Sequence, residues 1–212
     1  SPNLVGKALG LEVKEGLPVP SLVAPRPPKL CDGCPHVDSY TALNEAMKSF
    51  PGGRVFSDIG CYTLGALPPF QAIYSTVDMG ASITMAKGAS EADLLPSVAV
   101  IGDSTFTHSG MTGLLDCCVD NANVTVIILD NGITGMTGSQ KSSATGRIES
   151  ICTGLGVDPA HIRVINPLKK YFEENVAIMK EEIAYKGVSV IIPRRECIVA
   201  LNKRLKAAKK AQ

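Results

Sequence analysis

Two polar side chains in this sequence have the type and spacing of metal ligands. Asp103 directly follows the apolar run 98–102, and Asn131 comes 28 positions later, just beyond the apolar run 124–129. The carboxyl ends of parallel strands lie at one edge of a sheet, so neighbouring strands would bring the two side chains together. A carboxylate, an amide oxygen and a backbone carbonyl near Ile133 offer three oxygens to Mg²⁺, and diphosphate oxygens and water would complete its octahedral shell.

Each of these residues also has an ordinary structural interpretation. Asp and Asn after strands are common turn and N-cap residues. Met79, within residues 77–82 (Val-Asp-Met-Gly-Ala-Ser), would most often be a core side chain. The order and spacing of the residues, rather than any one of them, therefore favour a site for a cation and a diphosphate.

The same residues resemble a known motif. Residues 102–104 (Gly-Asp-Ser) and Asn131 are similar to the diphosphate-binding motif of thiamine diphosphate enzymes, which usually reads Gly-Asp-Gly and later Asn-Asn. Ser104 and Asp130 depart from that pattern, whereas both metal-ligand positions match it. The segment around Met79 resembles the part of these enzymes that places a bulky apolar residue beneath the bent cofactor, a role that suits an unbranched thioether.

Longer stretches resemble one family within this group. The matching stretches are 26–36, which includes Cys-Asp-Gly-Cys-Pro-His, and 58–68, 79–82, 101–110, 129–131 and 136–140. They look like the C-terminal thiamine-diphosphate domain of the large subunit of indolepyruvate:ferredoxin oxidoreductase, and the similarity runs from about Arg26 to Cys197. The resemblance implies oxidative decarboxylation of an arylpyruvate to an aryl-acetyl-CoA, with electrons leaving through iron–sulfur clusters to ferredoxin. The bond chemistry would belong to the cofactor, which the domain anchors and holds bent.

The resemblance also suggests roles for individual residues. His36 is interpreted either as a catalytic group or as a hydrogen-bonded structural histidine. The family usually has Arg after Cys-Pro-His, but Val37 stands there, so we expect any carboxylate contact of that Arg to be missing and substrate preference to differ. The expected Mg²⁺ ligands are Asp103, Asn131 and the Ile133 carbonyl. The residues expected to contact the cofactor are Gly60, Cys61, Tyr62, Met79, Gly80, Gly102, Asp103, Ser104, Asn131, Ile133, Met136 and Thr137.

Four cysteines form a second candidate site. Cys31 and Cys34 have the close spacing of thiolate ligands for iron–sulfur clusters or zinc, and Cys61 and Cys197 follow strand-like runs. The set resembles the four cysteines that hold a [4Fe–4S] cluster in related 2-oxoacid:ferredoxin oxidoreductases. Two alternatives stay open: a four-thiolate zinc site, or a reduced Cys31–Cys34 pair with two small buried cysteines. The remaining cysteines, Cys117, Cys118 and Cys152, are predicted to be structural.

Three other functions compete with this one. A serine hydrolase of the Gly-Asp-Ser type would use Ser104 as nucleophile, with His161 as base and Asp158 as its orienting carboxylate. A non-redox thiamine enzyme, such as a decarboxylase or synthase, would need the Mg²⁺ ligands but no thiolates. A Rossmann-like nucleotide-binding domain has no support, because the chain contains neither Gly-x-Gly-x-x-Gly nor a P-loop sequence.

The helices and strands that must position these residues are predicted to form a doubly wound α/β domain. Continuously apolar runs such as 126–129 (Val-Ile-Ile-Leu) are typical of strands buried on both faces, which indicates a mostly parallel sheet with helices on both sides. The predicted strands are 54–57, 72–75, 98–102, 124–130, 161–165 and 188–192. The predicted helices are 39–49, 81–89, 110–121 and 168–185.

Proline and charge divide the chain into three parts. Residues 1–30 are predicted to be an N-terminal extension and linker, because five prolines between Gly16 and Leu30 disfavour helix. Residues 31–198 form the predicted cofactor-binding domain. Residues 199–212 form a predicted basic C-terminal helix or tail, with apolar residues spaced four apart.

Composition limits the partners. The chain has 212 residues, 21 Lys and Arg against 20 Asp and Glu, and a net charge of +1, which argues against nucleic acid or an anionic membrane as the main partner. No apolar run is long enough to span a membrane and no secretory signal is present, so we expect a cytoplasmic protein.

The resemblance implies that further domains and partners complete the enzyme. The partners expected from it are a pyrimidine-binding domain and a ferredoxin-like domain of the same large subunit, a small subunit, ferredoxin, CoA and the arylpyruvate, together with homo-oligomer contacts. The activating Glu of thiamine enzymes comes from the pyrimidine-binding domain, so the isolated chain is expected to be inactive.

Overall fold

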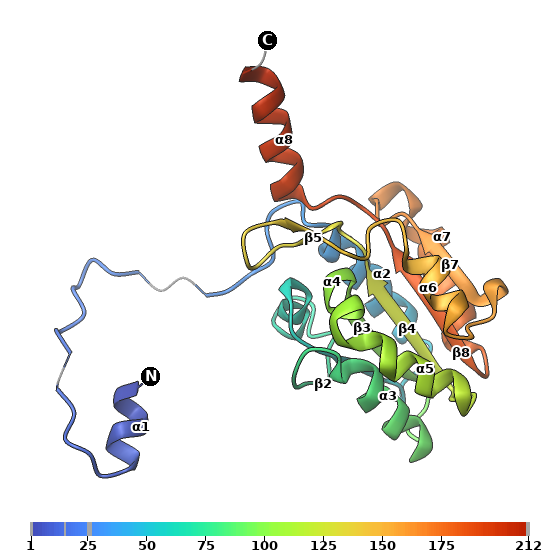
Figure 1. Ribbon diagram of the computed structural model, residues 1–212, viewed down its shortest axis with the longest axis horizontal. Coiled ribbons are helices and arrows are strands. Elements are labelled where there is room, and N and C mark those ends of the chain that lie inside the picture. The colour runs from blue at the N-terminus through green and yellow to red at the C-terminus, as the bar shows by residue number, and fades with distance from the viewer. Residues whose placement is uncertain (1, 15, 25–26, 211–212) are drawn as a thin grey trace.

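A six-stranded parallel sheet forms the centre of the structure, a computed structural model that describes residues 2–14, 16–24 and 27–210 (Figure 1). The strand order is β2-β1-β3-β4-β8-β7, and every neighbouring pair is parallel. The strands are β1 (Arg54–Ser57), β2 (Ser75–Thr76), β3 (Ser97–Gly102), β4 (Val124–Leu129), β7 (Ile162–Ile165) and β8 (Val188–Pro193).

Helices cover both faces of this sheet. On one face, Ile83 of α3 and Leu114 of α5 pack with the strand residues Ile101 and Ile128. On the other face, Leu43 of α2 packs with Val100 and Ile127, whose side chains point to the opposite side of the same strands. All residues of β3, β4 and β8 are buried, so the alternating side chains of each strand supply two separate cores. The predicted doubly wound α/β fold is confirmed. The helices are α1 (Pro2–Ala8), α2 (Pro35–Met47), α3 (Ala81–Glu91), α4 (Asp103–Thr105), α5 (Met111–Val119), α6 (Ile148–Gly154), α7 (Phe172–Ala184) and α8 (Ile198–Lys210).

The strand order creates a switch point between β1 and β3. After β1 the chain adds β2 on one side, and then it returns to add β3 on the other side. Connections on the two sides of such a point diverge, which opens a crevice beyond the carboxyl ends of the two strands. Asp58 and Asp103 are the first residues beyond β1 and β3, so both lie at this crevice.

Several element boundaries differ from those predicted. The first domain helix begins at Pro35 rather than Ser39, because proline fits the first helical turn, where no N–H is required. The predicted strand 72–75 pairs with β1 only through Ser75 and Thr76. The predicted helix 168–185 begins at Phe172, after a 3₁₀ turn, and ends at Ala184.

Several short elements were not predicted. Among them are α6, α1, and an antiparallel hairpin of β5 (Ile133–Thr134) and β6 (Gln140–Lys141). In addition, α4 continues into a π-helical turn, Phe106–Gly110, before α5 begins. Such turns are common near functional sites, and this one follows Asp103 directly.

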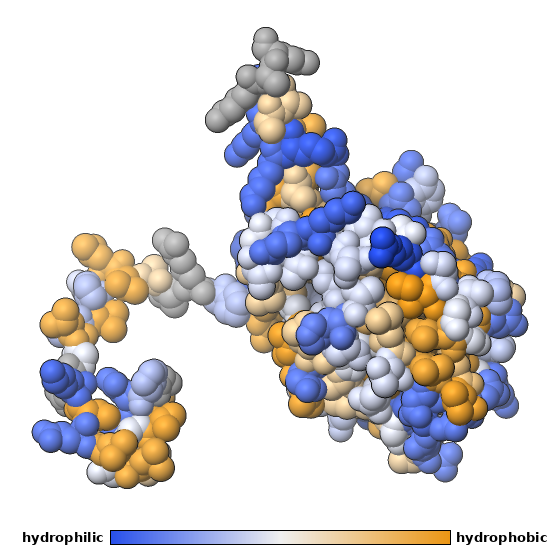
Figure 2. All heavy atoms as spheres, viewed as in Figure 1, coloured by the Kyte–Doolittle hydropathy of each residue, from blue (hydrophilic) through white to orange (hydrophobic). Residues whose placement is uncertain are grey.

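The two ends of the chain extend away from the domain (Figure 1). The N-terminal part carries α1 and an extended segment in which large apolar side chains such as Leu17 and Leu22 are exposed. Figure 2 shows much of this N-terminal part in orange. The basic helix α8 projects upward in this view and leaves the domain close to where the N-terminal segment joins it. Residues 1, 15, 25–26 and 211–212, which include part of the predicted linker and tail and the start of the family resemblance at Arg26, lie outside the described residues. The division into linker, domain and tail stays a prediction.

Over the described ranges, no helix is both long and apolar enough to cross a membrane.

Candidate cofactor site

A cavity of about 240 Å³ opens at the switch point between β1 and β3. Of the predicted cofactor residues only Gly80 is not part of its lining, and its neighbour Met79 is. The cavity also has wall residues that were not predicted, among them Ile59, Thr134 and Gly135. The predicted residues that line it are His36, Gly60, Cys61, Tyr62, Met79, Gly102, Asp103, Ser104, Asn131, Ile133, Met136 and Thr137.

Asp103 and Asn131 lie at neighbouring strand ends. Gly102 pairs with Leu129 in the ladder between β3 and β4, which places the two following segments side by side. The Gly132 N–H donates to Asp103 Oδ2 over 3.1 Å, and the Ile133 N–H donates to Asn131 Oδ1 over 3.0 Å. The backbone N–H groups of one short loop therefore contact both predicted metal ligands.

Asp103 is a buried carboxylate without a cationic partner. Its residue is 2% exposed, and burial raises the pKa of its carboxyl to about 6, with a further rise from the negative charge of Asp130. Asp130 itself is paired with Arg194, whose Nε lies 2.6 Å from Asp130 Oδ2. Within the described part of the chain Asp103 has no ion pair, so a bound divalent cation would supply the missing positive charge.

A second buried carboxylate, Asp58, was not predicted to have a role. It accepts hydrogen bonds from Tyr62 Oη, from Ser82 Oγ over 2.6 Å and from the Gly80 N–H over 3.1 Å. Burial raises the pKa of this carboxyl against the effect of these donors. Asp58 thus connects Tyr62 on one side of the cavity with the segment of Met79 on the other side. Its position directly after β1, equivalent to that of Asp103 after β3, is the sequence signal that could have revealed it.

Two glycines allow this close packing. A Cβ atom at Gly102 would lie 2.5 Å from the Tyr62 ring. Gly80 precedes α3 with φ +94°, in the left-handed region, where a side chain is strained, and a Cβ there would lie 2.5 Å from Ser109 Oγ. Ser104, which departs from the usual motif, lines the cavity and accepts a hydrogen bond from Thr134 Oγ1 over 2.8 Å.

The predicted cluster cysteines line a second cavity of about 130 Å³, which contains Cys31, Cys34, Cys61 and Cys197. Burial raises the pKa of the Cys34 thiol to about 11, and the other three cysteines add to the rise. Among the described residues, no three His, Cys, Asp or Glu side chains converge tightly enough to hold a single metal ion. The other cysteines lie elsewhere: Cys117 and Cys152 are fully buried in the core, and Cys118 packs against it.

His36 lies between the two cavities. His36, Cys61, Asn131 and Gly135 line both of them. The His36 residue is 3% exposed, its Nε2 lies 3.3 Å from Asn131 Nδ2, and its ring meets the Tyr62 ring edge-on with centroids 6.4 Å apart. Burial lowers the pKa of His36 to about 4, so the imidazole is neutral at pH 7.

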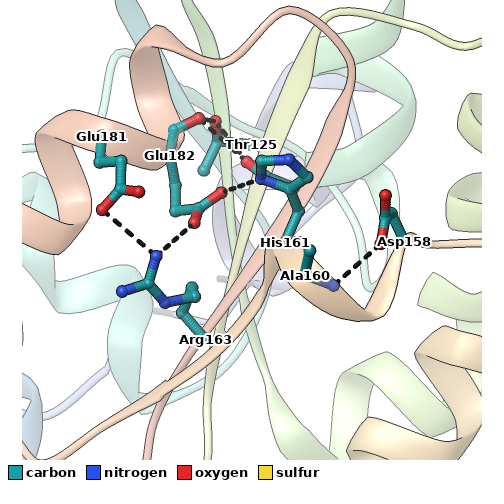
Figure 3. Close-up of polar contacts among 8 residues, drawn as sticks. Thr125, Asp158, Ala160, His161, Arg163, Glu181 and Glu182 are labelled. Carbon is teal, nitrogen blue, oxygen red and sulfur yellow. Dashed lines mark hydrogen bonds and ion pairs between the residues drawn. The ribbon is translucent and has the colours of Figure 1, made fainter.

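The structure does not assemble the serine hydrolase triad, so that alternative is wrong. Ser104 follows the carboxyl end of β3, whereas His161 precedes the amino end of β7, at the opposite edge of the parallel sheet. Moreover, His161 Nδ1 contacts Glu182 Oε2 at 2.9 Å, and Asp158 instead accepts a hydrogen bond from the Ala160 N–H (Figure 3).

Solved structures of thiamine enzymes share the fold. A 2-oxoglutarate:ferredoxin oxidoreductase from Magnetococcus marinus, solved with 2-oxoglutarate, coenzyme A and succinyl-CoA bound, matches with a TM-score of 0.66 at 18% identity, over 82% of this chain and 66% of that one. A benzoylformate decarboxylase from Polynucleobacter necessarius matches with a TM-score of 0.53 at 14% identity, over 74% and 33%. At these identities the similarity concerns the fold alone.

Sequence comparison is more specific. "Indolepyruvate oxidoreductase subunit IorA" of Archaeoglobus fulgidus is 35% identical over 92% of this chain and 34% of its own length. The protein of the same name from Thermococcus kodakarensis is 37% identical over 84% of this chain and 30% of its own length. The chain therefore spans about a third of the length of the curated relatives it matches.

One protein-family description matches most of the domain. Residues 58–192 match the family "Thiamine pyrophosphate enzyme, C-terminal TPP binding domain". The matched region begins at the buried carboxylate after β1 and ends within β8, so it contains Asp103, Asn131 and most of the cavity wall. The chain belongs to the C-terminal, thiamine-diphosphate-binding domain family of the thiamine diphosphate enzymes.

Proposed function

We propose that this chain is the part of an arylpyruvate:ferredoxin oxidoreductase that holds the diphosphate end of thiamine diphosphate through Mg²⁺. The observation that carries the proposal is the buried Asp103, which has no ion pair among the described residues, beside Asn131 at the switch-point cavity. The relatives named indolepyruvate oxidoreductase support the choice of an arylpyruvate such as indolepyruvate as substrate.

The donor set fits the cation. Asp103 provides a carboxylate oxygen, Asn131 an amide oxygen and Ile133 a carbonyl oxygen, all of the hard type that Mg²⁺ prefers. Ser104, Thr134 and Thr137 line the same cavity and offer hydroxyl groups to diphosphate oxygens. When bound, thiamine diphosphate supplies the carbanion that adds to the keto carbon of the substrate and accepts the electrons released on decarboxylation.

The remaining wall residues shape the space for the cofactor. Met79 is 40% exposed at the rim, where its flexible side chain can support the bent cofactor from below. Tyr62 is fixed by Asp58, and together with Ile59 and Leu129 it gives the cavity an apolar wall that limits access of water. Positioning and exclusion of water are therefore the contributions of these residues.

The four-cysteine cavity supports a [4Fe–4S] cluster as the electron acceptor. All four cysteines line one cavity that shares wall residues with the cofactor cavity. An iron–sulfur core holds its thiolates farther apart than a single ion does, which agrees with the absence of a tight single-ion site among the described residues. Metal binding would release the thiol protons, since burial raises the pKa of Cys34 and of Cys61.

The proposed enzyme needs more than this chain. Because the chain spans about a third of its relatives' length, the pyrimidine-binding and ferredoxin-like domains of the large subunit, a small subunit, CoA and ferredoxin are proposed as partners. We expect the isolated chain to bind the diphosphate end but to form no acyl-CoA from a 2-oxoacid.

Calorimetric titration of the chain with thiamine diphosphate tests the proposal. With Mg²⁺ present we expect saturable binding, and in Asp103→Ala an affinity at least about 10-fold weaker, or about 1.4 kcal/mol. Glu181→Ala, at the opposite edge of the sheet, is the control that should bind as the parent does. Equal affinity in the parent and Asp103→Ala would contradict the ligand assignment.

Iron and sulfide analysis after purification without oxygen tests the cluster. We expect about four iron and four sulfide per chain in the parent, and near-complete loss in Cys61→Ser. Cys152→Ser, a change to a buried core cysteine, should retain both. Less than one iron per fresh parent chain would exclude the cluster and favour a non-redox thiamine enzyme.

A further inference from the structure

The orientation of the Asn131 carboxamide is determined by an unambiguous donor. The Ile133 backbone N–H lies 3.0 Å from the Asn131 side chain, and a backbone N–H can only donate. The atom that accepts from it must be the carboxamide oxygen, so the NH₂ group occupies the other position. That NH₂ group, Asn131 Nδ2, lies 3.3 Å from His36 Nε2.

The same reasoning determines the tautomer of His36. Because Asn131 Nδ2 carries hydrogens and no lone pair to accept with, Nε2 of His36 must be the acceptor. The ring proton of the neutral imidazole is then on Nδ1, the less common location for an unconstrained histidine. Among the described residues Nδ1 has no hydrogen-bond partner, so its N–H is left for a group bound in one of the two cavities that the ring lines.

We propose that His36 is a positioning residue, locked as the Nδ1–H tautomer, whose Nε2 holds Asn131 with its oxygen directed to the cation. The inference rests on the proposed function only where it concerns the cation. His36 adds to the Ile133 N–H in holding this orientation, because rotation of the carboxamide by 180° would present NH₂ hydrogens to a positive ion. Partners of this kind, which orient a metal ligand without touching the metal, change metal affinity by about 10- to 100-fold.

The His36 ring is itself held in place. It belongs to the first turn of α2, after Pro35, and it is 3% exposed. Tyr62 meets it edge-on with the ring planes at 89°, and the Tyr62 hydroxyl is bound to Asp58. A rigid acceptor therefore faces Asn131.

Nuclear magnetic resonance of the cofactor-free chain tests the tautomer directly. The chain has three histidines, so long-range ¹H–¹⁵N correlation spectra with His36→Gln as the assignment variant identify the ring nitrogens of His36. At pH 7 we expect the Nδ1–H pattern for His36 and a shift toward the Nε2–H pattern in Asn131→Ala. An Nε2–H pattern in the parent, or no change in Asn131→Ala, would overturn the proposal.

Two variants of His36 test the positioning role. Gln can place an acceptor near the site of Nε2, whereas Leu has a similar size and no acceptor. In Mg²⁺ titrations at a fixed concentration of thiamine diphosphate, we expect His36→Leu to need about 10-fold more Mg²⁺ for half-saturation and His36→Gln about 3-fold more at most. Parent-like behaviour of His36→Leu, or an equal loss in both variants, would refute positioning through Nε2.

Failure of the two proposals can be told apart. If the parent chain shows no Mg²⁺-dependent binding at all, the proposed function is at fault, and the NMR result still decides the tautomer. If the parent binds, Asp103→Ala does not and His36→Leu does, the function stands and the positioning role is wrong. Far-UV circular dichroism of every variant identifies those that fail to fold.

Discussion

The carboxyl ends and the amino ends of the parallel strands form two opposite sides of the sheet, called here the carboxyl edge and the amino edge. Buried carboxylates at these two edges differ in whether a cationic side chain pairs with them. At the carboxyl edge, Asp103 is 2% exposed and has no cationic partner among the described residues. At the amino edge, the Glu182 side chain is 1% exposed, but Arg163 Nη1 lies 3.0 Å and His161 Nδ1 lies 2.9 Å from its oxygens (Figure 3). Burial is similar in both places, so the difference lies in charge compensation.

The amino-edge group also ties backbone elements together. The carbonyl oxygen of Glu182 accepts hydrogen bonds from Thr125 Oγ1 over 3.0 Å and from Ser189 Oγ over 3.1 Å, which connects α7 to β4 and β8. A carboxylate that is fully paired inside such a network serves the stability of the fold. A carboxylate left unpaired at a cavity lowers stability until a ligand arrives, and this contrast identifies the functional edge.

The largest effect on stability is expected at the amino edge. Glu182→Ala removes the shared partner of Arg163 and His161 and should lower the free energy of unfolding by about 3 kcal/mol. Urea denaturation measures this loss. The matched control is Glu181→Ala, because Glu181 also contacts Arg163 but is 65% exposed, and its loss should cost at most about 0.5 kcal/mol.

Equal losses in Glu181→Ala and Glu182→Ala would mean that burial does not matter here, and the contrast between the edges would fail. Thiamine diphosphate affinity, by comparison, should be the same in both variants and the parent.

The next effect is expected at the carboxyl edge, with the opposite sign. The pKa of Asp103 rises from 3.8 to about 6 on folding, so between these pH values the folded chain holds a proton that the unfolded chain lacks. Stability of the cofactor-free chain therefore falls as pH rises through this window, by about 3 kcal/mol at most from this group. Asp103→Asn should be up to about 3 kcal/mol more stable than the parent at pH 7.5, and nearly equal to it at pH 4.

His36 also changes stability with pH, so the stability of the parent must be compared with that of Asp103→Asn at each pH. Its pKa falls to about 4 on folding, so its contribution to stability is lost as pH drops from about 6.5 toward 4, opposite to that of Asp103. The difference between parent and Asp103→Asn, followed by urea denaturation across pH, removes the His36 contribution. A difference that does not change with pH would show that Asp103 is compensated after all.

The smallest effect on stability is expected from removing one hydrogen-bond donor to Asp58. Tyr62→Phe removes one of the donors to Asp58 and should lower the free energy of unfolding by about 1 kcal/mol, since other donors remain. Tyr74→Phe, at a tyrosine that is 66% exposed, is the control and should have almost no effect. Equal results in urea denaturation would mean that Asp58 does not depend on Tyr62.

Long, continuously apolar segments were predictable from sequence, and short contextual ones were not. The runs that became β3 and β4 are buried on both faces, and their pattern alone indicates a parallel sheet. In contrast, α6 has seven residues and β5 has two, too few for a period to show. Their stability comes from contacts that form only in the folded chain.

The candidate site shows the same division. The spacing of Asp103 and Asn131 indicated neighbouring strand ends, and the ladder between β3 and β4 places them there. The position of Asp58 directly after β1 could have marked it as a candidate, but its contacts with Tyr62 and Ser82, the second of which is 24 positions away, are visible only in the folded structure. The contact between His36 and Asn131 joins residues 95 positions apart, so it could not be predicted from the sequence and is seen only in the folded structure.

The shared wall of the two cavities carries a thermodynamic consequence. His36, Cys61, Asn131 and Gly135 each border both spaces, so one set of atoms must adapt to both occupants. If filling one space alters the affinity of the other by some factor, linkage requires the same factor in the reverse direction. A bound iron–sulfur cluster would then change the affinity for thiamine diphosphate, and bound thiamine diphosphate would change the affinity for the cluster equally, before any electron is transferred.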